Sequence, residues 1–289
     1  MRRICHLAAA LLLVLTQALP TQAAERIAAI DWAQAETLLA LGLAPLAIAE
    51  PDGYREWVGK PELPATVADI GSRRAPNLER LAALKPDLIL SHDLLAAMQP
   101  GLEAIAPVRS VVFGGNGQDT WRTIVSATRD LGAQTKRDAE VEALLTKADA
   151  AFAQARRRIE AAGLAGSPVY VVRLVTGSAL RIDGARSMAA EVLQRLGLRN
   201  AYDGPVNEWG FATAEIDALA GDPEAFVLAV GPNAPGTMAA MFESPVGRAL
   251  PAVGAGRVRE LPVVWTYGGV PSAMRMADAI ADALAPDTP

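Results

Sequence analysis

Apolar residues along this chain follow two alternating spacings, and these spacings outline the predicted elements. Short apolar runs such as residues 26–30 and 45–49 predict strands, and the stretches between them repeat apolar residues every three or four positions, as helices do. From residue 138 to about residue 163 the helical spacing continues without Pro, and Gly occurs only at its end. This stretch predicts one long helix of about 39 Å. A second series of strands and helices follows it.

The alternation of strands and helices on both sides of the long helix predicts two α/β lobes with parallel sheets. A similar phrase occurs in each half of the chain. Asn77 or Thr213 stands where a helix N-cap is expected, a Glu follows two positions later, and an apolar strand comes further on. We therefore predict two Rossmann-like α/β lobes, residues 24–137 and 164–289, joined by a backbone helix at residues 138–163.

The first 23 residues have the layout of a secretory signal peptide. Arg2 and Arg3 precede an apolar run from residue 7 to residue 15, which is too short to span a bilayer, and small and polar residues follow it. We expect cleavage after Ala23. The arginine pair leaves both the general secretory route and the twin-arginine route open. The sequence therefore predicts an exported protein located in the periplasm.

Composition and charge narrow the range of functions. The formal net charge is −5 at pH 7 and the pI is about 5.2, which argues against a nucleic-acid binder because such a protein needs a basic face. After removal of the signal the chain has no Cys and a single histidine, His92, which excludes the His/Cys clusters that hold zinc or copper. No nucleophile elbow, Walker loop or complete dinucleotide fingerprint is present. We therefore predict a binding protein without catalytic residues, metal ligands or a cofactor.

Aromatic residues are the first candidates for a ligand site. Ligands of open α/β sheets bind outside the carboxyl ends of strands, so two facing lobes predict a shared cleft. In "VVWTYGG" the alternation of a strand puts Trp265 and Tyr267 on one face, and the two glycines that follow allow close backbone approach. Trp57 and Trp209 are expected in loops beside glycine. The other two tryptophans are assigned to packing: Trp32 and Trp121.

Polar residues at strand ends are the second group of candidates. Arg73 and Arg74 precede the Asn77 cap and form either an anion clamp at the mouth of the cleft or two solvated side chains. The clamp is chemically reasonable because a guanidinium group offers a planar fork of donors to oxygen ligands. His92 and Asp93 directly follow an apolar strand. A single histidine at such a place is either a ligand contact or a hydrogen-bonded structural residue.

Several longer segments resemble a known family. They include "ERIAAIDWAQAETLLALGL", "YREWVGKPELP", "IGSRRAPNLERLAALKPDLIL", "NEWGFATAEIDAL", "SPVGRALPAVGAGRV" and "PVVWTYGGVPSAM". In this order and spacing they are similar to the iron-siderophore periplasmic binding proteins, and among them to the ferric hydroxamate binders. The resemblance implies the helical-backbone class III fold, a shallow aromatic cleft for a ferric siderophore, and delivery to an inner-membrane ABC importer. Iron would enter only as part of the siderophore.

The resemblance also implies roles for particular residues. The cleft positions that carry over are Trp57, Arg73, Trp209, Trp265 and Tyr267. Arg73 would contact the oxygens that coordinate iron, and Glu79 and Glu215 fall where the family has its importer-docking glutamates. Ferric hydroxamate binders also place a tyrosine after the strand at residues 88–90. The matching position here is about Leu95, so His92 or Arg74 is the candidate replacement.

Three alternatives stay open beside a monomeric siderophore-binding protein. The ligand could be haem or a corrinoid, whereas the lack of a His, Cys and Tyr cluster argues against a free metal ion. His92 with Asp93 could belong to a periplasmic enzyme that processes siderophores. The chain could also be a scaffold or sensor with a vestigial cleft, although the cleft aromatics and Arg73 argue against that.

Overall fold

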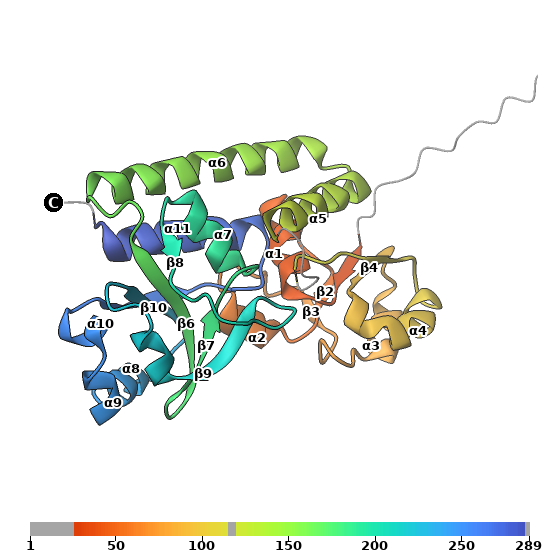
Figure 1. Ribbon diagram of the computed structural model, residues 1–289. Helices are drawn as coiled ribbons and strands as arrows, with labels where there is room; N and C mark the ends of the chain where they lie inside the picture. The colour runs from red at the N-terminus through yellow and green to blue at the C-terminus, as the bar shows by residue number, and fades with distance from the viewer. Residues whose placement is uncertain (1–25, 115–119, 287–289) are drawn as a thin grey trace, which may run out of the picture.

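The computed structural model describes residues 26–114 and 120–286 and contains two lobes bridged by long helices (Figure 1). The predicted signal peptide, residues 1–23, lies outside the described residues. Within the described ranges no helix is both long enough and apolar enough to cross a membrane.

The N-lobe is built on a five-stranded parallel sheet in the order β3-β2-β1-β4-β5. Its strands are β1 (Ile27–Ala29), β2 (Ala47–Ile48), β3 (Ala68–Asp69), β4 (Leu88–Ser91) and β5 (Val108–Ser110). Its helical elements are α1 (Trp32–Ala40), α2 (Pro51–Trp57), α3 (Leu78–Leu84), the 3-10 helix η1 (Asp93–Met98) and α4 (Gln99–Glu103). The strand order reverses between β1 and β4, and a crevice forms at such a switch point.

The C-lobe sheet has the order β11-β10-β6-β7-β9, and β8 pairs with β6. Its strands are β6 (Pro168–Thr176), β7 (Ala179–Asp183), β8 (Arg199–Asn200), β9 (Phe211–Glu215), β10 (Phe226–Gly231) and β11 (Val258–Val263). The helical elements of this lobe are α7 (Met188–Arg195), the 3-10 helix η2 (Ile216–Ala220), α8 (Thr237–Phe242), α9 (Pro245–Arg248) and α10 (Pro251–Gly254).

The prediction of a wholly parallel sheet is wrong for the C-lobe. β6 runs antiparallel to β7, and β7 runs antiparallel to β9. β6 and β7 are joined by a tight turn in which Gly177 has a φ of +56°. A connection this short can only reverse the chain, because a parallel pair needs a crossover of about a dozen residues or more.

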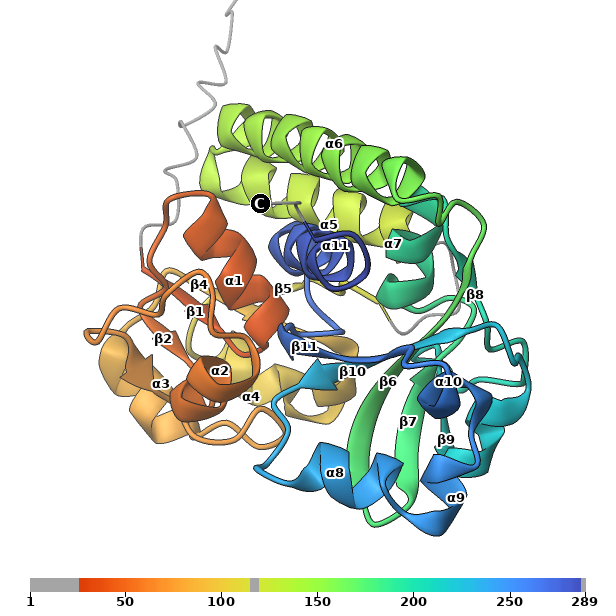
Figure 2. The same ribbon diagram turned by 90° about the vertical axis from the view of Figure 1, so that its left-hand side faces the viewer.

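The chain passes from the N-lobe to the C-lobe through α5 (Thr120–Thr135) and α6 (Asp138–Ala161), and the C-terminal helix α11 (Val270–Leu284) packs beside them. α6 lies within the range expected for the long helix, and it crosses above both lobes in Figures 1 and 2. Its buried side chains form the predicted stripe, which consists of Val141, Leu145, Ala148, Phe152, Ala155 and Ile159. α11 packs along α6 and also contacts α1, α5 and α7, and Figure 2 shows it between α1 and α7.

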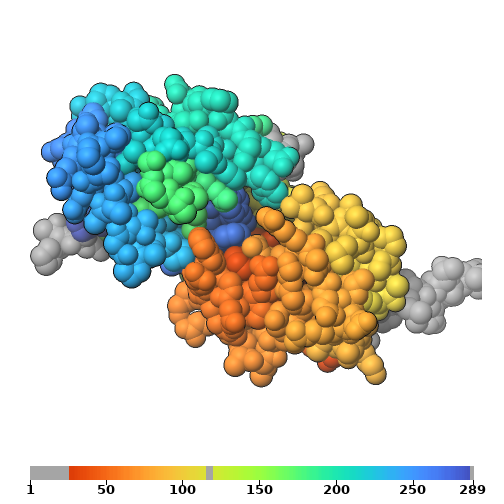
Figure 3. Space-filling view, turned by 90° about the horizontal axis from the view of Figure 1, so that it is seen from below, coloured from red at the N-terminus to blue at the C-terminus, as the bar shows by residue number. Residues whose placement is uncertain are grey.

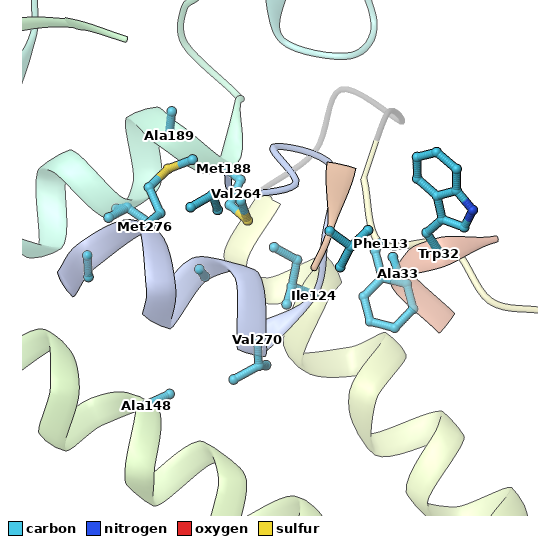
Figure 4. Close-up of a cluster of buried hydrophobic side chains, with 14 of the residues drawn as sticks. Trp32, Ala33, Phe113, Ile124, Ala148, Met188, Ala189, Val264, Val270 and Met276 are labelled. Carbon is cyan, nitrogen blue, oxygen red and sulfur yellow. The ribbon is translucent and has the colours of Figure 1, made fainter. Parts of the chain in front are cut away.

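One hydrophobic core is continuous across the boundary between the lobes. It joins Trp32 of α1 and Phe113 of the N-lobe to Met188 of α7 and to Val264 and Met276 of the C-lobe (Figure 4). Two smaller clusters fill the outer faces of the two sheets. Because the lobes share their largest core, they pack as one body and are not linked by a loose hinge.

The two predicted helix caps have different outcomes. Asn77 is confirmed as the N-cap of α3, where its side chain accepts a hydrogen bond from the backbone N of Arg80 at 2.9 Å. The prediction for Thr213 is wrong, because Thr213 lies in β9 and pairs with Arg181 of β7. Alternating Phe, Ala and Thr suits a pleated edge strand, and pairing with β7 overrides the local cap signal.

Candidate ligand-binding cleft

The two lobes face each other across a furrow, which Figure 3 shows from below. Two cavities in this furrow are lined by both lobes and share Tyr267 as a common wall. We call the first, of about 340 Å³, the arginine compartment; its walls include Trp57, Arg73, Arg173, Arg181, Trp265 and Tyr267. We call the second, of about 280 Å³, the histidine compartment; its walls include Asp31, His92, Leu94, Met188, Trp209 and Tyr267.

The N-lobe wall is formed where β1 and β4 end, on the two sides of the switch point. Asp31 and Trp32 are the second and third residues after β1, and His92 directly follows β4. Asp31 also caps α1, because its side chain accepts a hydrogen bond from the backbone N of Ala33 at 2.9 Å. These side chains therefore stand at the carboxyl ends of the two strands that flank the switch point.

Arg73 is the cation of the N-lobe wall. Its Nε donates to Glu50 at 3.0 Å, and its guanidinium carbon lies 3.6 Å from the centroid of the Trp32 ring. Its Nη1 lies 3.8 Å from Oδ2 of Asp31. Burial works to raise the pKa of Glu50, but its hydrogen bonds with Arg73 and the Arg73 charge outweigh burial and lower that pKa. The guanidinium is thus held over an aromatic ring, with donors left for a ligand.

Trp32 packs in the core, as predicted, and also forms part of the cleft. Its side chain is buried and its Nε1 donates to the backbone oxygen of Ala49 at 3.0 Å. One face of the ring supports Arg73, and the ring borders the arginine compartment. A core residue thus also supports a charged side chain of the cleft wall.

Trp265 and Tyr267 form the C-lobe wall, but they do not lie on a strand as predicted. β11 ends at Val263, and both residues belong to the turn that leads into α11. Their rings are still neighbours, with centroids 5.2 Å apart. The centroid of the Tyr267 ring also lies 6.1 Å from that of Trp209 and 6.0 Å from that of Phe211. An edge-to-face aromatic cluster therefore lines the C-lobe side.

Two arginines of the cleft were not found from the sequence. Arg173 of β6 is only 8% exposed, and it donates to the backbone oxygens of Gly231 and Val264 at 2.9 and 3.1 Å. Its guanidinium carbon lies 5.0 Å from the centroid of the Trp57 ring. Trp57 is the last residue of α2, so the prediction that it lies in a loop is wrong. The available signal was a charge inside the apolar run "VYVVRLV". Such a charge on a central strand requires a partner or a ligand.

Arg181 and Asp183 of β7 set the electrostatics behind Tyr267. Arg181 lies 4.8 Å from the Phe211 ring, and Asp183 is buried. Burial raises the pKa of Asp183 to about 7 against the opposing charges of Arg173 and Arg181. Burial also raises the pKa of Tyr267 to about 12. The phenol therefore keeps its proton at neutral pH and can donate a hydrogen bond to a ligand oxygen.

In the segment after β4, the residues that line the histidine compartment differ from the position that the sequence comparison indicated. Leu95, the position matched to the expected tyrosine, is 3% exposed and packs in the outer N-lobe core. His92 and the 70%-exposed Leu94 line the compartment in its place. Asp93 also borders it and accepts a hydrogen bond from Ser110 at 2.5 Å. The side chains that reach the cleft here are thus an imidazole, a carboxylate and an alkyl group.

Three other predicted residues lie outside both compartments. Arg74 is exposed, and its backbone N donates to the Ser72 hydroxyl at 3.2 Å. Glu79 is exposed in the first turn of α3. Glu215 is exposed at the end of β9, where it accepts a hydrogen bond from Ser178. The two glutamates therefore stand on different lobes.

The chemistry available in the cleft is that of recognition. Guanidinium groups and a protonated phenol can donate to oxygen atoms, and the tryptophan rings can cover an apolar surface. Among residues 26–114 and 120–286, no group of three or more His, Cys, Asp or Glu could hold a metal ion. The guanidinium and phenol donors suit a ligand that is rich in oxygen atoms.

Comparison with known proteins agrees with this geometry. The family model described as "Periplasmic binding protein" matches residues 27–264, which include most of both lobes. The chain belongs to this family. Membership in the periplasmic binding proteins confirms the predicted fold class of two α/β lobes joined by a long helix.

Individual relatives narrow the resemblance within the periplasmic binding proteins. The iron(3+)-hydroxamate-binding protein FhuD of Escherichia coli K12 is 31% identical over 259 residues, which cover 90% of this chain and 86% of FhuD. The crystal structure of Fe3+–Desferal-bound FhuD from Vibrio cholerae superposes with a TM-score of 0.85 at 31% identity, covering 92% and 100% of the two chains. The vitamin B12-binding protein of Yersinia pestis (strain Pestoides F) is 38% identical over 84 residues, 29% of each chain. The predicted resemblance to siderophore-binding proteins is confirmed, and so is the prediction that the chain is not an enzyme.

Proposed function

We propose that this protein captures a ferric siderophore in the cleft between its lobes and hands it to an inner-membrane ABC importer. The observation that carries the proposal is the arginine compartment, where Arg73 and Tyr267 present donors beside tryptophan rings. A siderophore already fills the coordination sphere of its iron, so the protein needs only to recognise the outer surface of the complex. A hydrogen bond from a charged group to a ligand oxygen contributes about 1.5–3 kcal/mol.

The charges around the arginine compartment favour a hydroxamate ligand. Its three arginines each have a carboxylate close by: Glu50 and Asp31 near Arg73, and Asp183 near Arg173 and Arg181. Asp183 is only partly ionised near neutral pH because burial raises its pKa to about 7, so the surroundings keep at most a small positive charge. Three hydroxamates, each with one negative charge, give an uncharged complex with Fe3+, whereas three catecholates give a trianion. An uncharged complex can bind in a compartment that has no large net positive charge, whereas a trianion would favour a positively charged one.

Tryptophan fluorescence tests this proposal directly. Three tryptophans border the compartments, Trp57, Trp209 and Trp265, besides the core platform Trp32. A ligand bound there is expected to quench their emission. We expect ferric Desferal to quench with saturation, and haem and cobalamin to quench only weakly. Saturable quenching by haem or cobalamin without any by ferric siderophores would overturn the proposal.

A corrinoid is the second candidate ligand. The similarity to the vitamin B12-binding protein of Yersinia pestis supports it, although that similarity covers only 29% of this chain. The FhuD similarity covers 90% of the chain. We therefore rank the siderophore above the corrinoid, and the fluorescence panel separates them.

Delivery requires a surface that the importer can recognise on both lobes. We propose that Glu79 and Glu215 supply it, since each is exposed and each stands on a different lobe. Two carboxylates at a fixed spacing suit a pair of basic patches on a two-subunit permease. The protein would act as a monomer in the periplasm and would need neither nucleic acid nor a cofactor.

A further inference from the structure

The carboxylate of Glu36 is fully buried at the boundary between the lobes. Glu36 belongs to α1 of the N-lobe, yet its oxygens bind the N-terminus of α11. The backbone N of Gly269 donates to Oε1 at 2.5 Å, and the hydroxyl of Ser272 donates to Oε2 at 2.6 Å. Gly269 is the N-cap residue of α11 and has no side chain to cap it. The helix therefore receives its cap from the other lobe.

Arg275 extends this contact to a second N-lobe helix. Its Nη1 donates to the backbone oxygen of Val58, the C-cap residue of α2, at 2.6 Å. Its Nη2 donates to Ser272 at 3.0 Å and lies 3.5 Å from Glu36. α1 and α2 of the N-lobe are thus both bound to the first turns of α11 by buried or half-buried polar groups. Removing one of these polar side chains would leave the others without hydrogen-bond partners in a buried interface.

The glycine pair after Tyr267 makes room for this contact. A Cβ at Gly268 would stand 2.3 Å from Oε1 of Glu36 and 2.4 Å from the Ser272 hydroxyl. A Cβ at Gly269 would stand 2.7 Å from the Thr37 hydroxyl. The close approach that "VVWTYGG" predicts is therefore made by helix α1 of the facing lobe.

The contact lies immediately beside the C-lobe wall of the cleft. Tyr267 precedes Gly269 by two residues, and the backbone N of Gly268 donates to the oxygen of Trp265 at 3.1 Å. The turn that carries both aromatic residues therefore runs between the end of β11 and a helix start held by Glu36. Any movement of Gly269 would move Tyr267 and, through the turn, Trp265.

We infer that Glu36 is a positioning residue, which holds the Trp265–Tyr267 turn in its binding geometry from the opposite lobe and keeps the lobes at a fixed spacing. Glu36 lines neither compartment, so it acts only through the turn. A wall that is already ordered loses no freedom when the ligand binds, and this supports affinity. The ligand readout of this inference rests on the proposed function, whereas its structural readout does not.

Two variants test the inference, Glu36→Ala and Glu36→Gln. In Glu36→Ala we expect faster amide hydrogen exchange over residues 264–272 in the protein without ligand. We also expect roughly tenfold weaker binding of ferric Desferal by isothermal titration calorimetry, because two aromatic side chains must be ordered on binding. Glu36→Gln keeps an acceptor for Gly269 and is expected to restore most of the protection and of the affinity. Unchanged exchange and affinity in Glu36→Ala would overturn the inference.

A matched control separates positioning from general loss of stability. Leu81→Ala removes a fully buried side chain from the outer N-lobe core, away from α11. If Leu81→Ala speeds exchange at residues 264–272 and weakens binding as much as Glu36→Ala, the inference fails. If Glu36→Ala does not fold, Ser272→Ala removes one of the two hydrogen bonds and gives the same readouts. If the wild-type protein does not bind ferric Desferal, the proposed ligand fails, while the exchange comparison still decides the role of Glu36.

Discussion

The indole rings of Trp32 and Trp265 meet edge to face across the boundary between the lobes, with centroids 5.0 Å apart and planes inclined at 63°. Trp32 starts α1 in the N-lobe, and Trp265 follows the last strand of the C-lobe. The guanidinium of Arg73 lies 3.6 Å from the first ring and 5.5 Å from the second. The cation and the two rings therefore hold one another in place, so the wall of the arginine compartment spans both lobes.

Two adjacent arginines give the sharpest test of this wall. Arg73→Ala is expected to weaken binding of ferric Desferal by about 10- to 100-fold, which corresponds to a lost charge-assisted hydrogen bond of about 1.5–3 kcal/mol. Arg74→Ala is the matched control, because Arg74 is exposed and lines neither compartment. Its affinity should stay within about twofold of the wild type. Fluorescence titration measures both, and equal losses in the two variants would contradict the assignment.

Trp265 is expected to contribute mainly its ring, because its Nε1 is buried rather than presented to the cleft. Trp265→Phe keeps a ring but removes the donor, whereas Trp265→Ala removes both. We expect a modest loss of affinity in the first variant and a larger loss in the second, since an aromatic contact adds about 0.5–1.5 kcal/mol beyond area. Calorimetric titration avoids the changed fluorescence, and equal affinities of the two variants would exclude a role for the ring.

Stability should depend on pH through Glu36. Burial, the largest influence, raises its pKa from 4.5 to about 7 even though Arg275 and the hydrogen bonds oppose it. The folded state then binds a proton more tightly than the unfolded chain, so the free energy of unfolding falls as pH rises from about 4.5 to about 7. The glutamine in Glu36→Gln cannot titrate. Between these pH values the free energy of unfolding of the variant should therefore fall by about 3 kcal/mol less than that of the wild type.

Urea denaturation of both proteins at several pH values measures this difference. Asp183, whose pKa burial also raises to about 7, leaves a decline in the same direction in the variant as well as in the wild type. The comparison of the two profiles therefore isolates Glu36. Parallel profiles would show that Glu36 does not titrate in this range.

The lobes are expected to move little when the ligand binds. They share one core, α6 and α11 cross between them, and Glu36 is hydrogen-bonded across the boundary. Closing the cleft by a large rotation would break these packed contacts. Small-angle X-ray scattering of the free and loaded protein should give the same radius of gyration within error. A clear compaction on loading would contradict this expectation.

Charge reversal tests the docking residues apart from ligand binding. Glu79→Arg and Glu215→Arg should leave the affinity for ferric Desferal unchanged, because neither residue lines a compartment. Each should reduce uptake of the siderophore in vesicles that contain the importer, since like charges would meet at the interface. Glu103→Arg, an exposed charge reversal on α4, is the control. Equal uptake by all three variants would exclude the two glutamates from docking.

Features that depend on local pattern were predictable from the sequence. The stripe of α6 follows from apolar spacing, and the Asn77 cap follows from the chemistry of one side chain and the next turn. Arg73, Trp265 and Tyr267 could be singled out because they follow strands or stand beside glycine. The lobes themselves follow from the alternation of strands and helices.

Contacts between distant segments decided the rest. The antiparallel pairing of β7 moved Thr213 from a helix cap into a strand, and the sheet placed Arg173 and Arg181 under the cleft. The strongest case is Glu36, whose partner Gly269 lies 233 positions away along the chain. The sequence alone indicated only that the two glycines after Tyr267 allow a close backbone approach. Only the packing of the two lobes decided that a buried carboxylate is what approaches, because no local pattern links residues so far apart.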